Sequence, residues 1–587
     1  MAGFELLESR RLTGPNLFWN HPGAVIDLAV PAELDAAALG RLWATEARQR
    51  LRAVGWGQHQ THARTFTGGI SLVLSAPVDA LYAACELNEM ALAAAQDRFR
   101  TGADRSAPAE SEPAVSEIEQ LRSTIAAEVN PPLLALKQAA EERGVAFLSD
   151  DEVASVGLGT GSVSWPVDAL PDPSEVPWDD VHDVPVLVVT GTNGKTTTVR
   201  LLASIMRAAG LVAGSTSTDG ITVGGDLVDA GDWSGPGGAR AVVRDRRVEI
   251  ALLEAARGGL LRRGLGVVDA NAAAVTNVAA DHMGEFGVSD LDELADVKLV
   301  VTRAAEHGVV VLNADDEHLT AAVKRRAESG AGPLRITWCT LHPTRPEIQA
   351  HLARGGVVCT IDDSELVILE GRDRTQVTGL SDIPVCLGGA ARHNVYNALT
   401  AAGLARAVGV SAEDIARGLA AIGGSADDNR GRGNFFRFGT TTALVDFAHN
   451  PHGLAALGHT VEQLPHARLL VAIGQAGDRD DHSIRALARA ALEMGPDRIL
   501  IKELDAYRRG RQPGEVPGLL EDELQRSGAA ADLWAHAGSD TEAARMALAW
   551  AQEGDMLVLT VQSELAAVLA LMADLDEAGW RAGAPLP

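Results

Sequence analysis

The stretch Pro185-Val-Leu-Val-Val-Thr-Gly-Thr-Asn-Gly-Lys-Thr-Thr-Thr198 joins an apolar run to a glycine-containing turn. Residues 186–189 are valine and leucine, which is typical of a buried parallel strand, and residues 199–206 repeat apolar side chains at helical spacing. A glycine turn between a strand and a helix lets backbone N–H groups and the helix N-terminus bind phosphate. Lys195 can add a positive charge there, and the Thr196 hydroxyl can hold Mg²⁺. The stretch therefore predicts a nucleotide-binding site.

One position departs from the general phosphate-loop pattern. Val189 stands where G-x-x-x-x-G-K-[ST] has its first glycine. The alternative interpretation is a strand–helix turn that contains Gly-Lys-Thr by chance. The strand and the helix expected on either side are the context that a phosphate loop needs, so we favour the nucleotide site.

Composition limits the classes of protein that this chain can represent. Its 587 residues predict three to four domains at roughly 150 residues each, and its 46% hydrophobic content is enough for buried cores. A net charge of −28 disfavours a nucleic-acid partner, because no basic field is present to displace counterions. The four cysteines form no C-x-x-C pair, so we expect reduced, buried thiols. With no signal-peptide pattern and no apolar run long enough for a bilayer, we expect a cytoplasmic protein without a membrane partner.

The order of predicted elements indicates an α/β protein with three domains. Residues 1–105 alternate strand-like and helical runs, as in a small α+β domain. Residues 106–183 read as a linker and connector, with a polar start, a helix over 131–143 and a glycine-rich hairpin over 156–166.

Two longer α/β units follow. Strands and helices alternate over residues 184–424, which predicts a doubly wound, mostly parallel sheet with the phosphate loop at the carboxyl end of a strand. A glycine-rich hinge over 423–433 leads to a second, Rossmann-like α/β domain over 425–587.

Several other side chains are candidates for metal binding or catalysis. His59 and His62 are spaced as two metal ligands can be, but no third ligand accompanies them, so we favour loop residues. Glu254 ends a predicted buried strand, where a carboxylate suits a metal ion or an attacking water. Asp281 and His282 end the next strand, and further candidates follow it: Lys298, Asn394, Asn397, Asp446 and His449. Each has a plain structural reading (a solvated helix lysine, a helix cap, a turn residue), but their joint order favours one site.

That order resembles the Mur ligase family, whose members form amide bonds with ATP. The resemblance covers residues 184–587 and rests on T-G-T-N-G-K-T-T, Glu254, N-x-x-x-D-H, a downstream lysine, N-A-D-D, H-N-x-x-N, Gly431-Arg432 and D-x-A-H-N-P. Within the family, residues 10–16, 217–220, 254–266 and 511–515 resemble the N-terminal domain and the Mur-ligase half of cyanophycin synthetases. Those enzymes insert an ATP-grasp domain after the segment that matches residues 139–144, whereas here we expect none. Around residues 81–89 the H-x-x-E-H metallopeptidase pattern of some relatives is absent.

The resemblance implies an acyl-phosphate mechanism with ATP and Mg²⁺ as cofactors. It assigns ATP contacts to Gly191, Thr192, Asn193, Gly194, Lys195, Thr196, Thr197, Asn394, Asn397, Arg432 and Asp446. Metal ligands would be Thr196, Glu254, His282 and a carboxylated Lys298, with Lys195, Glu254, His282 and Lys298 as catalytic groups. The substrate-binding candidates are Thr218, Arg257, Arg262, His449, Asp478, Arg479 and Glu515. Closure of the C-terminal domain would complete the site and exclude water.

We therefore predict an ADP-forming ligase that joins an amino acid, with arginine or another basic one as the candidate, to an acidic substrate such as an aspartyl unit. A cyanophycin-type peptide or enzyme is a candidate partner, and we expect a homo-oligomer. One alternative is a nucleotide-binding scaffold that has lost its chemistry and partners a cyanophycin-type synthetase. Another is a ligase that adds glutamate to a pterin or a cell-wall precursor, which the E-A-A-R-G-G-L-L-R-R run disfavours.

Overall fold

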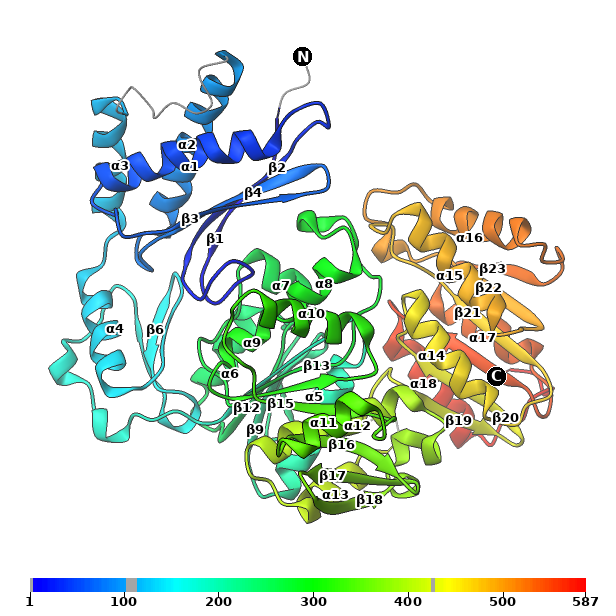
Figure 1. The fold of residues 1–587 in the computed structure, drawn as a ribbon. Helices are drawn as coiled ribbons and strands as arrows, with labels where there is room; N and C mark the ends of the chain where they lie inside the picture. The colour runs from blue at the N-terminus through cyan, green and yellow to red at the C-terminus, as the bar shows by residue number, and fades with distance from the viewer. Residues whose placement is uncertain (1–3, 102–112, 424–427, 587) are drawn as a thin grey trace.

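The architecture comes from a computed structural model that describes residues 4–101, 113–423 and 428–586. Figure 1 shows an N-terminal domain above a central domain, with the C-terminal domain at the side of the central one. The polar start of the predicted linker and part of the predicted hinge lie outside the described residues. No helix in the described ranges is long and apolar enough to cross a membrane. The cysteines are free; Cys339, Cys359 and Cys386 are buried, and Cys85 is half-buried.

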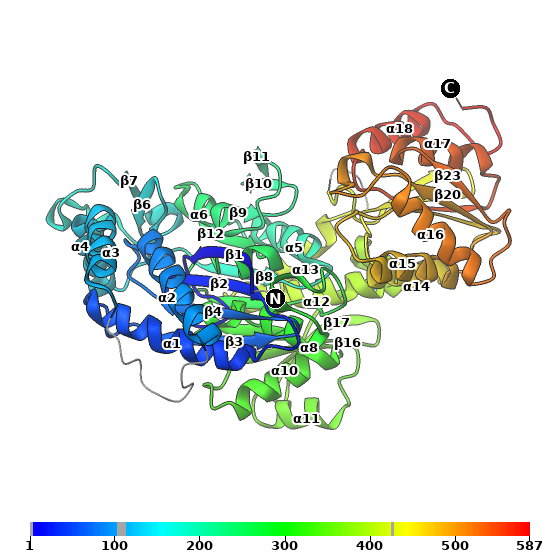
Figure 2. The same ribbon diagram turned by 90° about the horizontal axis from the view of Figure 1, so that it is seen from above.

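The N-terminal domain is an antiparallel sheet with two long helices on one face, which confirms the α+β prediction. Asp27 lies between Leu28 and Ile26, whose side chains point to the helices, so Asp27 and Val25 point to the opposite face. The sheet order is β1 (Glu5–Leu12), β2 (Gly23–Ala29), β4 (Gly69–Ser75) and β3 (Thr61–Phe66), and the helices are α1 (Ala36–Ala53) and α2 (Leu81–Thr101). The face opposite the helices turns toward the central domain (Figure 1), and seen from above the N-terminal sheet overlies part of that domain (Figure 2).

The connector contains more structure than a linker. Asn130 caps α4 with its side chain, and Gly144 ends this helix in the left-handed conformation, so the helix spans the predicted residues. The glycine-rich segment forms the expected hairpin within a small antiparallel sheet. The elements are α3 (Val115–Glu128), α4 (Pro131–Arg143), β5 (Phe147–Ser149), β6 (Val153–Val156) and β7 (Val163–Pro166).

The central domain is built on an eleven-stranded sheet in which β8 (Val186–Thr190) is an inner strand. In the centre of the sheet, the neighbouring strands from β9 through β8 to β16 run parallel, as expected for a doubly wound sheet. Antiparallel strands extend the sheet at both edges. The order is β11 (Asp226–Ala230), β10 (Gly220–Val223), β9 (Ala213–Thr216), β12 (Ile250–Glu254), β8, β13 (Ala272–Val275), β14 (Val309–Asn313), β15 (Ile336–Thr340), β16 (Val357–Asp362), β17 (Glu365–Glu370) and β18 (Asp373–Gly379).

Helices bury both faces of this sheet, which is why its inner strands are apolar throughout. On one face lie α5 (Lys195–Ala208), α12 (Arg392–Ala407) and α13 (Ala412–Ala421). On the other lie α6 (Pro236–Arg244), α7 (Arg257–Arg262), α8 (Leu291–Lys298), α9 (Val301–Ala304) and α10 (Glu317–Glu328), while α11 (Pro346–Ala353) packs near the antiparallel edge.

The structure explains the valine in the phosphate-loop pattern. Val189 is a fully buried residue of β8 and pairs with Glu254 on β12 and with Ala274 on β13. The strand therefore continues one residue further, and the turn starts at Gly191. A valine suits a buried strand better than a glycine would.

The C-terminal domain is a six-stranded sheet with helices on both faces, as predicted. Its β19–β20 pair is antiparallel and the other pairs are parallel. The strand order is β19 (Asn434–Phe438), β20 (Thr441–Asp446), β24 (Met556–Thr560), β21 (Leu469–Ile473), β22 (Arg498–Lys502) and β23 (Trp534–Ala537). One face carries α14 (Pro451–Glu462), α15 (Asp481–Glu493) and α16 (Glu515–Arg526), and the other carries α17 (Asp540–Trp550) and α18 (Leu565–Glu577).

Candidate active site

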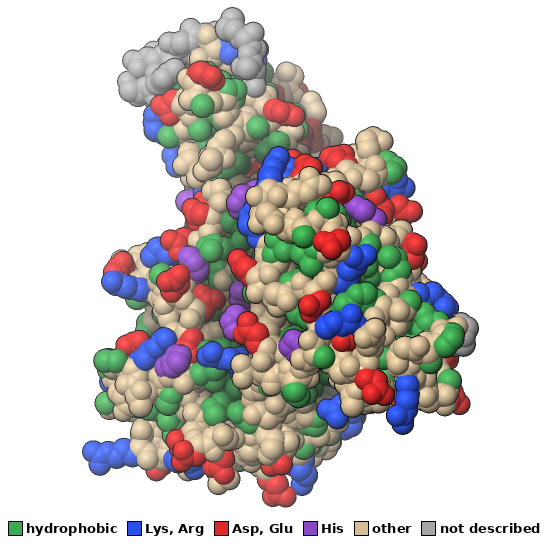
Figure 3. Space-filling model, turned by 90° about the vertical axis from the view of Figure 1, so that its right-hand side faces the viewer, with side chains coloured by type: hydrophobic (Ala, Val, Ile, Leu, Met, Phe, Trp, Pro, Cys, Tyr) green, Lys and Arg blue, Asp and Glu red, His purple; other side chains and the backbone are tan. Residues whose placement is uncertain are grey.

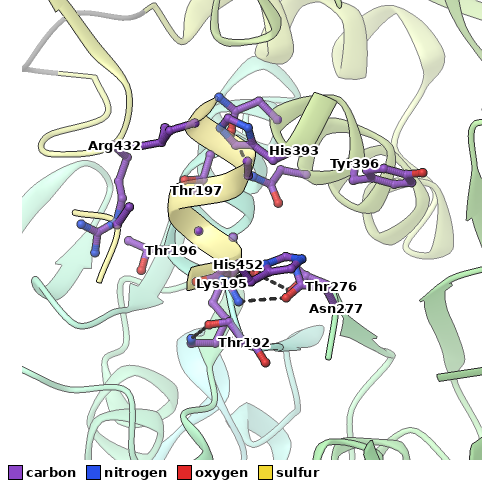
Figure 4. A pocket seen from close by; sticks show the side chains of 18 of the residues that line it. Thr192, Lys195, Thr196, Thr197, Thr276, Asn277, His393, Tyr396, Arg432 and His452 are labelled. Atoms are coloured by element: carbon purple, nitrogen blue, oxygen red, sulfur yellow. Dashed lines mark hydrogen bonds between the residues drawn. The ribbon is translucent and has the colours of Figure 1, made fainter. Parts of the chain in front are cut away.

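A cavity of about 480 Å³ lies between the central and C-terminal domains. The central domain lines it with the phosphate loop, the ends of β12, β13 and β14, and the start of α12, and the C-terminal domain adds Arg432 and residues after β20. In Figure 4, Lys195 and Thr196 lie on one side, and Arg432 and His452 approach from segments of the C-terminal domain. The space-filling view shows several histidines along the hollowed part of this face (Figure 3). The arrangement brings groups from distant parts of the chain to one cavity.

The phosphate loop has the shape that an anion site needs. Gly191 and Gly194 have φ of 151° and 84°, so both adopt backbone that side chains rarely take. A Cβ at Gly194 would lie 2.2 Å from Oδ1 of Asn397, so α12 packs directly on the turn. The first-turn N–H groups of α5 have no partner within the helix and point to the cavity end. Lys195 Nζ donates to the Thr192 carbonyl at 3.1 Å, close to where phosphate charge would sit.

Thr196 and Glu254 form a polar pair at the base of the cavity. The Thr196 hydroxyl donates to Oε2 of Glu254 at 2.8 Å, and Thr218 Oγ1 lies 3.4 Å from the same hydroxyl. Glu254 is 2% exposed, and burial raises the pKa of its carboxyl while the nearby Lys195 charge opposes that shift. Its Oε1 atom is buried without a hydrogen-bond partner among the described groups. An unpaired buried carboxylate oxygen next to a hydroxyl is what a hard cation such as Mg²⁺ would satisfy.

Lys298 is buried at the end of α8, so the structural alternative of a solvated helix lysine is wrong. Its side chain is 2% exposed, and it has no hydrogen bond or ion pair within the described part of the chain. Burial lowers its pKa well below the ordinary lysine value; the Lys195 charge lowers it further, and Asp281 opposes the shift. A lysine held toward its neutral form is a nucleophilic amine, as carboxylation by CO₂ would require.

The segment after β13 forms a charged network with the C-terminal domain. Asp281 pairs with Nε2 of His449 at 3.4 Å and with Nε of Arg479 at 3.3 Å. Arg479 Nη2 also donates to Nε2 of His282 at 2.6 Å, which leaves Nδ1 of His282 to donate to Glu285. Despite the cost of burial, the hydrogen bond and charge of His449 and the charge of Arg479 lower the pKa of the Asp281 carboxyl. Two domains thus meet through this network.

This network also bears on the metal prediction. The lone pair of His282 Nε2 faces Arg479, so in this arrangement the imidazole does not point to the Thr196–Glu254 pair. Across the described ranges, no group of three or more His, Cys, Asp and Glu side chains is placed to hold a metal ion. The residues therefore fit one cation at Thr196 and Glu254. The assignment of His282 and Lys298 as further ligands stays a prediction, and for His282 it requires Arg479 to move.

The two domains also touch at the phosphate loop itself. Asn193 Nδ2 donates to Oδ1 of Asn450 at 3.2 Å and to Nδ1 of His452 at 2.9 Å, and Asn450 Nδ2 donates back to Oδ1 of Asn193 at 3.0 Å. Asn450 is buried and caps α14. Arg200 of α5 extends this contact by donating to Oδ1 of Asn429 at 2.9 Å. The Asn193 side chain of the phosphate loop is therefore part of the domain interface.

The start of α12 supplies the far wall of the cavity. Asn394 Nδ2 donates to the Val385 carbonyl at 2.9 Å, and its Oδ1 accepts from Asn397 at 3.1 Å. Next to them, Nδ1 of His393 is buried without a partner among the described residues, and burial lowers the pKa of His393 to about 4. Neutral amide and imidazole groups can hydrogen-bond the edge of a base.

Across the cavity, Arg432 stacks on the Phe447 ring with 4.3 Å between the guanidinium carbon and the ring centroid. Asp446 accepts from the backbone N–H groups of Gly433 and Ala448 at 2.8 and 2.7 Å, so it fixes the loop on which it stands. Burial raises the pKa of its carboxyl, an effect that Arg432 opposes.

The substrate candidates divide into two groups. Thr218 and His449 line the cavity, and Arg479 reaches the segment next to it. Arg257 binds the side chain and carbonyl of Glu285, and Arg262 lies over the Phe286 ring, so both hold other parts of the fold.

Two acidic candidates already have cationic partners. Asp478 pairs with Arg479 and Arg509, and Glu515 accepts from Arg511 at 2.7 Å and from the Gln512 N–H at 3.0 Å. Both carboxylates are therefore already ion-paired within the chain, so they give no separate support to a basic amino acid as the substrate.

Among the site residues that were not predicted individually from the sequence are Arg200, His393, Asn450 and His452. The motifs that contain His393, Asn450 and His452 were recognised, but nothing in one sequence indicates which motif residue faces which domain. Arg200 stands at a helical position that reads as solvent-exposed.

Comparisons with known proteins agree with this arrangement. The family model described as the Mur ligase middle domain matches residues 189–405, and the Mur ligase glutamate ligase domain matches residues 431–561. Cyanophycin synthetase of Crocosphaera subtropica is 38% identical over 66% of this chain and 43% of its own length. Cyanophycin synthetase of Synechocystis sp. is 39% identical over 57% of this chain and 38% of its own. The chain thus spans less than half the length of these curated relatives.

More distant relatives also match. A UDP-N-acetylmuramoyl-L-alanyl-D-glutamate–2,6-diaminopimelate ligase of Geobacillus kaustophilus is 27% identical over 64% of this chain and 73% of its own length. Among solved structures, E. coli FolC in complex with DHPP and ADP aligns with 21% identity over 67% of this chain and 89% of that one, with a TM-score of 0.47.

Proposed function

Because the chain belongs to the Mur ligase family, we propose that it is an ATP-dependent, ADP-forming ligase that joins an amino acid to a carboxylate of an acidic substrate. The observation that carries the proposal is the Thr196–Glu254 pair beneath the phosphate loop, where a buried carboxylate oxygen has no partner among the described groups. A structural carboxylate would be expected to have both oxygens satisfied. A cation bound together with the nucleotide would be the partner of this oxygen.

The residues of the cavity suit phosphoryl transfer to a carboxylate. The substrate carboxylate attacks the γ-phosphate of ATP, the bond to ADP breaks, and an acyl phosphate forms; the incoming amine then displaces inorganic phosphate and loses a proton. The reaction demands positioning and neutralisation of spread negative charge. The N–H groups at the start of α5 and Lys195 provide both for the phosphates. Mg²⁺, held by Thr196 and Glu254, would add positive charge next to the phosphate oxygens.

Residues from the two domains divide the remaining tasks. His393, Asn394 and Asn397 form the wall suited to the adenine base, and Asp446 and Arg432 face them from the C-terminal domain. The Asn193–Asn450 contact keeps the domains together over the phosphates, which excludes water from the acyl phosphate. We place Lys298, as a carboxylated side chain, and His282 near the reacting carboxylate, where movement of Arg479 would free the imidazole.

The substrates are proposed from similarity. An aspartyl-containing peptide of the cyanophycin type is the first acceptor to test, because the cyanophycin synthetases share 38–39% identity with the chain. Arginine is the first amino acid to test. Since Asp478 and Glu515 are paired within the chain, neutral and acidic amino acids belong in the same screen.

The experiment is a screen for phosphate release from ATP with Mg²⁺, in which acidic dipeptides and aspartyl oligomers are combined with each amino acid. We expect release only when an acceptor and an amino acid are both present, with a product whose mass equals their sum minus water. A Lys195→Ala variant is the matched control and should lose the activity. Tight ATP binding without release for any pair would refute the ligase and favour a nucleotide-binding scaffold.

A further inference from the structure

The segment that carries His282 has an unusual backbone. In the loop of residues 281–289, here called the His282 loop, φ is positive at His282 (54°), Gly284 (88°), Phe286 (52°) and Gly287 (67°). His282 and Phe286 have side chains, and L-residues with side chains rarely adopt this left-handed conformation. Such a backbone persists only where the surrounding structure holds it. The contacts that hold it therefore decide where His282 points.

Two sets of contacts come from the domains that build the cavity. Arg257 of α7 donates from Nη1 to Oε2 of Glu285 at 3.0 Å and from Nη2 to the Glu285 carbonyl at 2.8 Å. Arg479 of the C-terminal domain donates to His282 at 2.6 Å. These contacts fix the first half of the loop, up to Glu285.

The second half of the loop is held by the N-terminal domain. Arg64 on β3 donates from one nitrogen, Nη2, to the Gly287 carbonyl at 3.1 Å and to Oε1 of Glu293 at 2.9 Å. Glu293 lies in the first turn of α8, and its other oxygen accepts from the N–H of Ser289 at 2.7 Å. Lys298 ends the same helix. One guanidinium group thus ties the His282 loop to the helix that carries Lys298.

Further contacts from the same sheet face surround the loop. A Cβ at Gly287 would lie 2.4 Å from ring atoms of Phe66, so this ring covers the loop backbone directly. Arg10 lies 5.0 Å from the Phe286 ring centroid and is itself fixed by Asp27 at 2.5 Å. These groups stand on the face of the N-terminal sheet that α1 and α2 leave free, and that face is turned to the central domain (Figure 1).

We propose that the N-terminal domain is a positioning element of the active site, in which Arg64 holds the His282 loop and the Lys298 helix in their working geometry. Neither Arg64 nor Phe66 lines the cavity, so both act through the loop. The proposal that Arg64 holds the loop does not depend on which reaction the protein catalyses, whereas the predicted effect on turnover rests on the proposed ligase function.

Two variants from opposite sides of the contact test this role. Arg64→Ala removes the guanidinium group from the N-terminal domain. Glu293→Gln weakens the same contact, together with the hydrogen bond from Ser289, without altering the N-terminal sheet. Arg64→Lys keeps one cationic donor. Arg41→Ala is the matched control, because Arg41 is an arginine of the same domain on α1 whose side chain is 63% exposed and pairs, among the described residues, only with Asp35, at 3.7 Å.

Hydrogen exchange read by mass spectrometry on the intact chain is the first measurement. The amides of Gly284, Val288 and Ser289 are hydrogen-bonded within or next to the loop and report on it. Arg64→Ala and Glu293→Gln should accelerate exchange over residues 281–290 on the order of tenfold, with β8 and α5 unchanged. Arg64→Lys should lie between Arg64→Ala and the unaltered chain, and Arg41→Ala should match the unaltered chain. Unaltered exchange in both Arg64→Ala and Glu293→Gln would overturn the proposal.

Kinetics are the second measurement. Arg64→Ala should lower kcat about 10- to 100-fold, because misplaced catalytic groups slow the chemical step, while KM for ATP changes less than about threefold. Equal kcat with raised KM would contradict a positioning role. If the unaltered chain ligates no substrate pair, the proposed function fails, and the exchange result still decides whether Arg64 holds the loop.

Discussion

The glycine that ends the phosphate-loop turn offers a sharp test of the site. We expect Gly194→Ala to weaken ATP binding strongly, because the substitution meets two separate obstacles. The residue has φ of 84°, which costs an alanine about 1–2 kcal/mol. The new methyl would also lie 2.2 Å from Oδ1 of Asn397, and relief of such crowding costs about 1–3 kcal/mol. The total is about 2–5 kcal/mol for the native loop geometry.

The same helix provides a matched control. Gly210 follows α5 and has φ of 80°, and a Cβ added there would meet no described atom within 4 Å, so Gly210→Ala meets only the backbone obstacle. The difference between the two variants is therefore the crowding, about 1–3 kcal/mol. If ATP requires the native loop, this crowding alone corresponds to about 5- to 150-fold weaker binding, and the backbone cost at Gly194 adds to it because Gly210 lies at the opposite end of α5 from the phosphate turn.

Isothermal titration with a non-hydrolysable ATP analogue measures the effect, and thermal unfolding of both variants reports the shared backbone cost. Gly194→Ala should bind at least about fivefold more weakly than Gly210→Ala, and adding Asn397→Ala should reduce the unfolding penalty of Gly194→Ala below the sum of the single changes. Equal analogue affinity for Gly194→Ala and Gly210→Ala would refute the placement of ATP at this turn.

Three further predictions address the cation, the domain contact and pH. Glu254→Gln should shift the Mg²⁺ dependence of ATP turnover to at least about tenfold higher concentration, whereas Glu249→Gln, at an exposed position, should not; equal Mg²⁺ curves would remove Glu254 from the metal site. Asn450→Ala should enlarge the radius of gyration in X-ray scattering, because it removes both hydrogen bonds to Asn193, and an unchanged radius with ATP present and absent would contradict the contact. The hydrogen bond from His282, with the charge and the hydrogen bond of Arg257, lowers the pKa of Glu285 from 4.5 to about 2, so its stabilisation of the loop is full above pH 4.5 and is lost as the pH falls toward 2. Hydrogen exchange over residues 281–290, corrected for its intrinsic pH dependence, should show loop opening through that window, and Glu285→Gln should abolish the change.

Much of the fold could be predicted from sequence because its signals are local. The β8–turn–α5 unit has apolar strand residues, two required glycines and helical spacing within residues 186–206, and α4 has its Asn130 cap and Gly144 end in place. The strands β10 and β11 at one edge of the central sheet were not predicted. All residues of β11 are exposed, so this strand lacks the apolar alternation by which a strand is recognised.

The site could be predicted as a set of motifs but not as a geometry. The sequence order indicated Lys195, Glu254 and Asp446, and the structure places all three around one cavity. Burial of Lys298 and the contact of His282 with Arg479 depend on packing between segments far apart in the chain, which one sequence does not encode locally. For the same reason, Glu515 was interpreted as a substrate group although Arg511, four residues before it, already pairs with it.

The most direct test of the proposed chemistry follows oxygen from the acceptor to phosphate. An aspartyl acceptor whose reacting carboxylate carries ¹⁸O is incubated with ATP, Mg²⁺ and the amino acid found in the screen, and the released phosphate is analysed by mass spectrometry. An acyl-phosphate mechanism predicts one ¹⁸O atom in each phosphate released by ligation, because the carboxylate oxygen that attacked the γ-phosphate leaves with it. Ligation with unlabelled phosphate would contradict the account.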